Sequence, residues 1–141
     1  MYELKLAILS NNIELINFLI QNGYNLNVKN EEGHTALHIA CYYGNIEIVK
    51  LLIKEKININ VKEKFGNTPL IVAVHQGYFK ITRFLIKNGA DITLKNEEGH
   101  TALSVAMIKK NSEIAKFLIK NGAGGNSDPE KDHEKIKEFI N

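Results

Sequence analysis

The sequence predicts an all-α solenoid of four stacked helix–turn–helix units with β-hairpin loops between them. The nonapeptide KNEEGHTAL occurs twice, at residues 29–37 and 95–103, and a looser version, KEKFGNTPL, lies halfway between them at 62–70. The period is therefore 33 residues, and self-similarity at such a period is typical of repeat architectures. Two positions of the unit keep one residue type in all four units: Leu4, Leu37, Leu70 and Leu103, and Ala7, Ala40, Ala73 and Ala106.

The third unit shows how each element is predicted. Thr68 can cap a first helix, and Pro69 fits its first turn, where a missing N–H costs nothing. Apolar residues then recur at helical spacing until Gly77, which can adopt the positive φ of a helix terminus. A second helix follows, with Ile81, Phe84 and Leu85 expected on its inner face, and Gly89 ends it before an extended loop. The second unit repeats this pattern, with Ile48, Leu51 and Leu52 on the inner face of its second helix.

The two ends of the chain depart from the repeat. The first unit starts directly at a helix, expected over residues 3–9, and has no hairpin before it. Terminal repeats turn a polar face to water, which Glu3, Lys5 and Ser10 would supply. We expect a repeat domain at 1–126, with units at about 1–29, 30–62, 63–95 and 96–126.

A final helix is expected within residues 127–141. Asp128 and Pro129 have the order of an N-cap and a first helical position, and the helix should extend to about Ile140. Ile136 and Phe139 fall 33 residues after Leu103 and Ala106, as in the first helix of an incomplete fifth unit. This helix would cap the core, although a mobile tail that docks on a partner is the open alternative.

These motifs resemble the ankyrin repeat family. The segment GHTALHIACYYGNIEIVKLLI, together with GNTPL at 66–70 and NGAD at 88–91, is similar to the phrases of that repeat, including T-P-L-H-x-A and its 33-residue length. The resemblance covers residues 1 to about 126. It implies a solenoid that binds other proteins and has no catalytic activity.

Two lysines stand where the family has a helix-terminating glycine. Lys110 takes this position in the fourth unit and Lys56 in the second. We expect both to adopt left-handed backbone, which costs a non-glycine residue about 1 kcal/mol.

Composition excludes several function classes. The net charge of +2 comes from 18 basic and 16 acidic residues. So small a charge does not indicate the clustered basic surface of a nucleic-acid-binding protein. Cys41 is the only cysteine, and no apolar run approaches the roughly 18 residues of a membrane span. The N-terminus also lacks the basic region of a signal peptide. We therefore expect a monomeric cytoplasmic protein without membrane contact, for which delivery into a host cell is an additional possibility.

No catalytic or metal-binding constellation is found. Cys41 and His38 are three residues apart, but Cys41 takes a core position, and the resemblance implies that His38 bonds between neighbouring loops. Helix packing distances place the equivalent residues His34 and His100 roughly 16–20 Å apart, too far to share a metal ion. The sequence also shows no metal site that includes His75 or His133. We expect neither a cofactor nor a metal.

The resemblance implies a set of contact positions on the concave side, beside the hairpin glycine and late in each first helix. These partner-binding candidates are Glu31, Glu32, His34, Tyr42, Tyr43, Lys64, Phe65, Asn67, His75, Gln76, Glu97, Glu98, His100, Ile108 and Lys109.

The candidates have acidic ends and an aromatic centre. Tyr42, Tyr43 and Phe65 are aromatic where solenoid packing does not require it, and exposed tyrosine is a frequent binding anchor. A partner with an apolar segment between basic ends would fit. Alternatively, the glutamates are merely solvated tips, and Tyr43 packs against Gln76 or the next hairpin.

The leading hypothesis is a non-catalytic protein–protein interaction module that acts as an adaptor, an inhibitor or a host-directed effector. The alternative is a binder of a small molecule or nucleotide that uses Tyr42, Phe65 and Lys64. A structural spacer is a third hypothesis, and the acidic tips disfavour nucleic acid. The resemblance also implies that Asn27 and Asn60 occupy the loop position at which asparagine is hydroxylated in the family.

Overall fold

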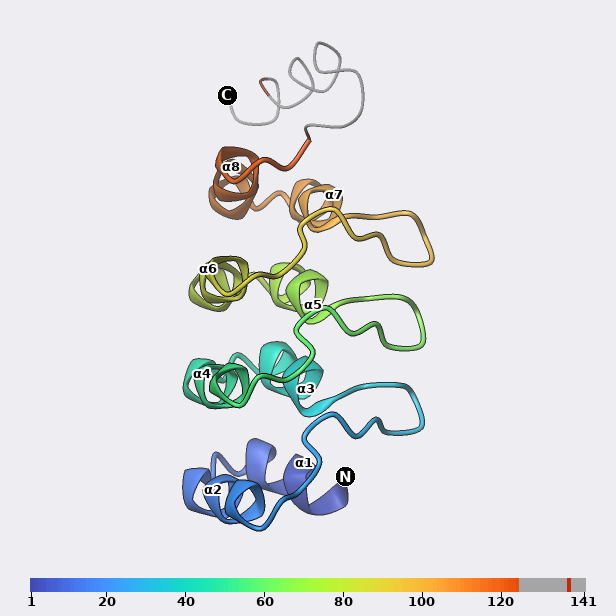
Figure 1. Ribbon diagram of the computed structural model, residues 1–141. Helices are drawn as coiled ribbons and strands as arrows, with labels where there is room; N and C mark the ends of the chain where they lie inside the picture. The colour runs from blue at the N-terminus through green and yellow to red at the C-terminus, as the bar shows by residue number, and fades with distance from the viewer. Residues whose placement is uncertain (125–136, 138–141) are drawn as a thin grey trace.

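The computed structural model describes residues 1–124 and 137, and these form eight α-helices and no strand. The helices are α1 (Tyr2–Leu9), α2 (Ile13–Gln21), α3 (Ala36–Tyr42), α4 (Ile46–Lys54), α5 (Pro69–Gln76), α6 (Phe79–Lys87), α7 (Ala102–Ile108) and α8 (Ser112–Lys120). Each odd-numbered helix pairs with the even-numbered helix that follows it (Figure 1). Four such pairs stack into the predicted solenoid. None of the helices described is long and apolar enough to cross a membrane.

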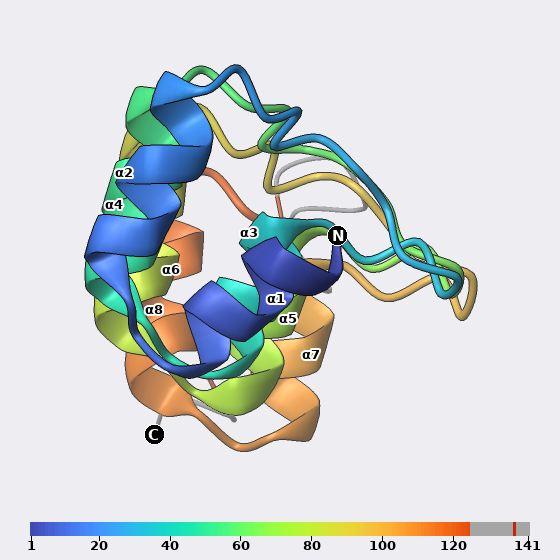
Figure 2. The same cartoon turned by 90° about the horizontal axis from the view of Figure 1, so that it is seen from below.

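The odd and even helices form two separate rows. Along the first row α1, α3, α5 and α7 pack against one another in order, and α4, α6 and α8 pack along the second. The loops before α3, α5 and α7 project to the same side of the stack (Figure 1) and nearly superpose when it is viewed from its N-terminal end (Figure 2). The concave side of the solenoid therefore lies between these loops and the odd helices.

The repeated leucines and alanines build the core. Leu4, Leu37 and Leu70 are almost fully buried, and Leu103 is 7% exposed. All four repeated alanines are fully buried, in the helices that stack directly on one another. A methyl side chain allows neighbouring helices to approach closely, which explains why this position stays small in every unit.

The helix ends confirm the sequence predictions. The Thr68 side chain accepts a hydrogen bond from the backbone N–H of Ile71, Pro69 is the first residue of α5, and Gly77 is left-handed with φ of 79°. Lys56 and Lys110 are also left-handed, with φ of 55° and 56°.

Asn11 adopts the same conformation, with φ of 52°, which the sequence analysis did not predict. It is the equivalent of Gly77 in the first unit, and asparagine tolerates the left-handed region better than most residues.

The three projecting loops are hairpins without strands. Each is closed by two backbone hydrogen bonds, which in the third unit run from Glu63 N–H to the Asn67 carbonyl at 3.1 Å and from Gly66 N–H to the Glu63 carbonyl at 2.9 Å. These bonds close the turn but do not continue into a ladder of paired strands. The hairpins also bond to one another, since Lys64 N–H donates to the Glu32 carbonyl and Glu97 N–H to the Phe65 carbonyl, both at 2.9 Å.

The N-terminal face is less polar than the sequence analysis predicted. Glu3, Lys5 and Ser10 are exposed as expected, but so are three apolar side chains of α1: Tyr2, Leu6 and Leu9. The reason is that α1 packs on α2 and α3 and is the first helix of the stack, so no preceding repeat among the described residues covers its outer side (Figure 1). The predicted helix of residues 127–141 lies outside the described residues, apart from the single position 137, and stays a prediction.

Candidate functional site

A groove of about 540 Å³ runs along the hairpins and the C-terminal ends of α3, α5 and α7. Its lining residues come from the second, third and fourth units: His34, Tyr42, Glu63, Phe65, Asn67, Ile71, Val72, His75, Gln76, Asn96, Glu98, His100, Val105, Ile108 and Lys109. The volume is in the range of pockets that hold a drug-sized molecule or a few side chains of a partner.

The groove brings together ten of the fifteen predicted contact residues. These ten are His34, Tyr42, Phe65, Asn67, His75, Gln76, Glu98, His100, Ile108 and Lys109. The other five, which are not lining residues, are Glu31, Glu32, Tyr43, Lys64 and Glu97. Most of the predicted acidic ends therefore belong to the hairpin tips and not to the groove, which favours the solvated-tip interpretation for them.

Two aromatic rings line the groove and stay open to solvent. Tyr42, at the end of α3, is 52% exposed, and Phe65, in the third-unit hairpin, is 62% exposed. Tyr43 lies edge-on to Tyr42, with ring centroids 5.0 Å apart. The Lys64 ammonium is 5.9 Å from the centre of the Phe65 ring, within the range of a cation–π contact.

Glu63 is the functional candidate that sequence reasoning missed. Its side chain is only 2% exposed, yet it lines the groove. One carboxylate oxygen, Oε1, accepts the backbone N–H groups of Phe65 at 3.0 Å and Asn67 at 2.8 Å. The other, Oε2, has His34 Nε2 as a neighbour at 3.8 Å, beyond hydrogen-bond distance.

A signal for Glu63 was present in the sequence. Asparagine occupies the equivalent position in the hairpins of the second and fourth units, as Asn30 and Asn96. There a single amide oxygen accepts the corresponding pair of backbone N–H groups at 2.9–3.0 Å. The hairpin therefore needs one acceptor oxygen, and Glu63 brings a second oxygen and a negative charge.

The side of the groove beside the helix ends is basic and exposed to solvent. Lys109 follows α7, and His75 lies in the last turn of α5. Partial burial and the nearby Lys109 ammonium lower the pKa of His75. Lys109 therefore supplies the lasting positive charge of this side of the groove at pH 7.

His38 and Cys41 are buried and have structural roles. Thr35 N–H donates to His38 Nδ1 at 3.2 Å, so the proton of the neutral ring is on Nε2, which donates to the Asn67 carbonyl at 3.0 Å. Burial lowers the pKa of His38 to about 4. Burial also raises the pKa of the fully enclosed Cys41 thiol. Neither side chain is open to a substrate.

Residues 1–124 and 137 hold no group of three or more His, Cys, Asp or Glu side chains that could bind a metal ion. His34, His75 and His100 all line the groove, but without that arrangement. His133 lies outside the described residues.

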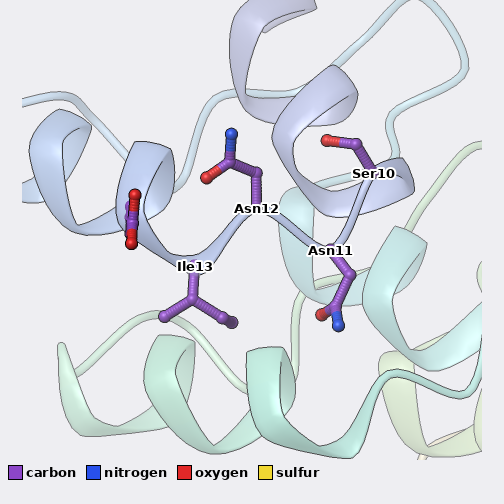
Figure 3. Close-up of a pocket in the computed structure, with 5 residues that line it drawn as sticks. Ser10, Asn11, Asn12 and Ile13 are labelled. Atoms are coloured by element: carbon purple, nitrogen blue, oxygen red, sulfur yellow. The ribbon is translucent and has the colours of Figure 1, made fainter.

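A second hollow lies at the turn between α1 and α2 (Figure 3). It is lined only by the continuous segment 10–14. The labelled side chains point in different directions, with Asn12 turned away from Asn11 and Ile13. Asn12 already caps α2 by accepting the Leu15 N–H at 3.0 Å. This hollow therefore offers no convergent polar groups.

Comparison with models of protein families shows the family to which the chain belongs. The family model for three copies of the ankyrin repeat matches residues 4–96, and the model for a single ankyrin repeat matches residues 98–130. The chain belongs to the ankyrin repeat family. Ankyrin repeats are generally non-enzymatic modules that mediate protein–protein interactions. A search of curated proteins finds none that matches this chain. Within the ankyrin repeats, the groove extends over the second, third and fourth units.

Proposed function

We propose that this ankyrin repeat domain binds a segment of another protein in the groove and has no catalytic activity. The observation that carries the proposal is the exposure of the Tyr42 and Phe65 rings inside a concave surface. Burying an aromatic ring in an interface yields much contact area at little cost in rotamer entropy. Such a domain acts by holding its partner, as an adaptor, an inhibitor or a host-directed effector does.

The nucleotide alternative has less support. It relied on Lys64 to meet phosphate, and Lys64 is not a lining residue. The groove contains the carboxylates of Glu63 and Glu98 against the single ammonium of Lys109. The carboxylates therefore outnumber the ammonium groups, which disfavours a phosphate group.

Placement of the protein in the cytoplasm is part of the proposal. Cys41, the only cysteine, is a buried free thiol, so the fold uses no disulfide and suits a reducing compartment.

Affinity capture from the native source tests the proposed function. We would compare the wild-type protein with a Tyr42→Ala/Phe65→Ala variant and with a control, Tyr2→Ala/Phe18→Ala, which removes two exposed aromatic rings outside the groove. Circular dichroism would confirm that all three proteins fold. We expect a protein that the wild type and the control retain and the groove variant loses. Equal retention by the groove variant would contradict the proposal.

A further inference from the structure

We infer that the groove recognises a basic side chain of the partner segment, an arginine or lysine, and that the Glu63 carboxylate binds it. This inference rests on the proposed function and specifies the chemistry of the partner. It also changes the expected pattern of the partner, because the basic residue meets the centre of the groove and not its acidic ends.

The first reason is that Glu63 has an oxygen that the fold does not need. Oε1 alone satisfies the backbone N–H groups of Phe65 and Asn67, the task that the amide oxygens of Asn30 and Asn96 perform in the other hairpins. In the fourth hairpin, Asn96 also donates a hydrogen bond from its Nδ2 to Asn67 Oδ1 at 3.0 Å. The equivalent contact of Glu63, to His34, is 3.8 Å and leaves Oε2 without a hydrogen bond.

The second reason is the cost of that oxygen. The Glu63 side chain is only 2% exposed, which makes its charge costly without a partner. No fully enclosed side-chain oxygen of the described residues lacks a hydrogen bond, so Oε2 keeps its small exposed area on the groove. The described neighbours provide no lysine or arginine within ion-pair distance of Glu63. Because the carboxylate forms part of the groove wall, a cation that enters the groove can supply the missing partner.

The third reason is the surface around Glu63. The rings of Tyr42 and Phe65 line the same groove, and aromatic faces attract cations. The Phe65 ring is 62% exposed, so its face is accessible to a cation in the groove. Arginine and lysine also carry apolar stems that pack on such rings.

The fourth reason is the distribution of charge along the groove. Glu63 neighbours His34 on the hairpin side, whereas Lys109 neighbours His75 beside the helix ends. A basic residue of the partner is therefore favoured at the hairpin side, where the Glu63 and Glu98 carboxylates lie, and is repelled from Lys109.

Selection from a random twelve-residue peptide library displayed on phage tests the inference. The wild-type protein would be used for selection, and the dissociation constants of the recovered peptides would be measured by calorimetry. Glu63→Gln is the test variant, since its amide oxygen can still accept the two hairpin N–H groups. Glu63→Asn is a second test variant, because asparagine supports the equivalent hairpins natively. Glu31→Gln is the matched control, a carboxylate outside the groove.

We expect recovered peptides to share one arginine or lysine and to bind both Glu63 variants at least about tenfold more weakly. Binding to Glu31→Gln should stay within about twofold of wild type. Replacing the shared basic residue of the peptide by glutamine should weaken binding to the wild type and have little further effect on Glu63→Gln.

Two outcomes would overturn the inference, and they are distinguishable. Peptides that bind through Tyr42 and Phe65 but share no basic residue, or that bind Glu63→Gln as tightly as wild type, would contradict the role of Glu63 and leave the proposed function standing. If every recovered peptide binds Tyr42→Ala/Phe65→Ala as tightly as wild type, or if no peptide is recovered, the groove is not a binding site for protein segments. That outcome would contradict both the proposed function and the inference.

Discussion

His38 Nε2 donates a hydrogen bond to the Asn67 carbonyl at 3.0 Å, and this bond ties the first helix of the second repeat to the hairpin of the third. The other ring nitrogen, Nδ1, accepts the Thr35 N–H and so completes the cap of α3. One buried imidazole therefore connects two repeats, and only its neutral form can make both bonds.

The first prediction is that His38 makes stability depend on pH. Its pKa is about 4 in the folded protein and 6.5 ordinarily, so the unfolded chain binds more protons between these values. Stability is therefore unaffected above pH 6.5 and falls as the pH drops toward 4, by on the order of 3 kcal/mol in total.

Denaturant unfolding of wild type and His38→Gln at pH 7.5 and 4.5 measures this effect. Glutamine can keep the capping bond to Thr35 but does not titrate. The variant should lose less stability than wild type between the two pH values. An equal loss in both proteins would mean that His38 is not the titrating group.

The second prediction compares two glycines with the same backbone. Gly66 and Gly99 both have φ of 78°, so alanine is equally strained at each. A Cβ at Gly66 would lie 2.8 Å from the backbone nitrogen of Glu97 in the next hairpin, whereas none of the described atoms lies within 4 Å of one at Gly99. Gly66→Ala should therefore cost about 1 kcal/mol more than Gly99→Ala in denaturant unfolding. Equal costs would show that the hairpins do not pack this closely.

The third prediction concerns two adjacent lysines with opposite responses to glycine. Lys110 is left-handed, with φ of 56°, so Lys110→Gly should relieve up to about 1 kcal/mol of strain and raise the melting temperature by a few degrees. Lys109 has helical backbone, with φ of −77°, so Lys109→Gly should lower the melting temperature. Calorimetry on the two variants checks the signs, and a lower melting temperature for Lys110→Gly would contradict the assigned strain.

The fourth prediction is that the Cys41 thiol is inert in the folded protein. It is fully buried, and burial raises its pKa, so little reactive thiolate forms near neutral pH. Ellman's reagent should react with it only at the rate of unfolding and promptly in 6 M guanidinium. Fast labelling of the native protein would contradict its burial.

Periodicity predicted most of the fold, because each unit repeats the same local constraints. The buried leucines and alanines and the left-handed Lys56 and Lys110 all follow from comparing equivalent positions 33 residues apart. The left-handed Asn11 lies at one such position and was not predicted.

The site was less predictable, because it depends on neighbouring repeats. Glu63 in a polar hairpin segment reads as a surface residue, and its burial follows only when the hairpins stack and bring His34 beside it. Conversely, Glu31 and Glu97 lie two residues before hairpin glycines and were predicted as contact residues, but they are not among those that line the groove. The position of a residue within the repeat predicts whether it lies on the concave side. The stacking of neighbouring repeats determines whether its side chain lines the groove.

The most direct test of the central claim is the dissociation constant of the captured partner for three proteins: wild type, Tyr42→Ala/Phe65→Ala and Tyr2→Ala/Phe18→Ala. Aromatic anchors at the centre of an interface typically contribute 2 kcal/mol or more, roughly a thirtyfold change in affinity. We predict at least that loss for the groove variant and affinity close to wild type for the control. Unchanged binding by the groove variant, or a larger loss in the control, would contradict the assignment of the concave groove as the interaction surface.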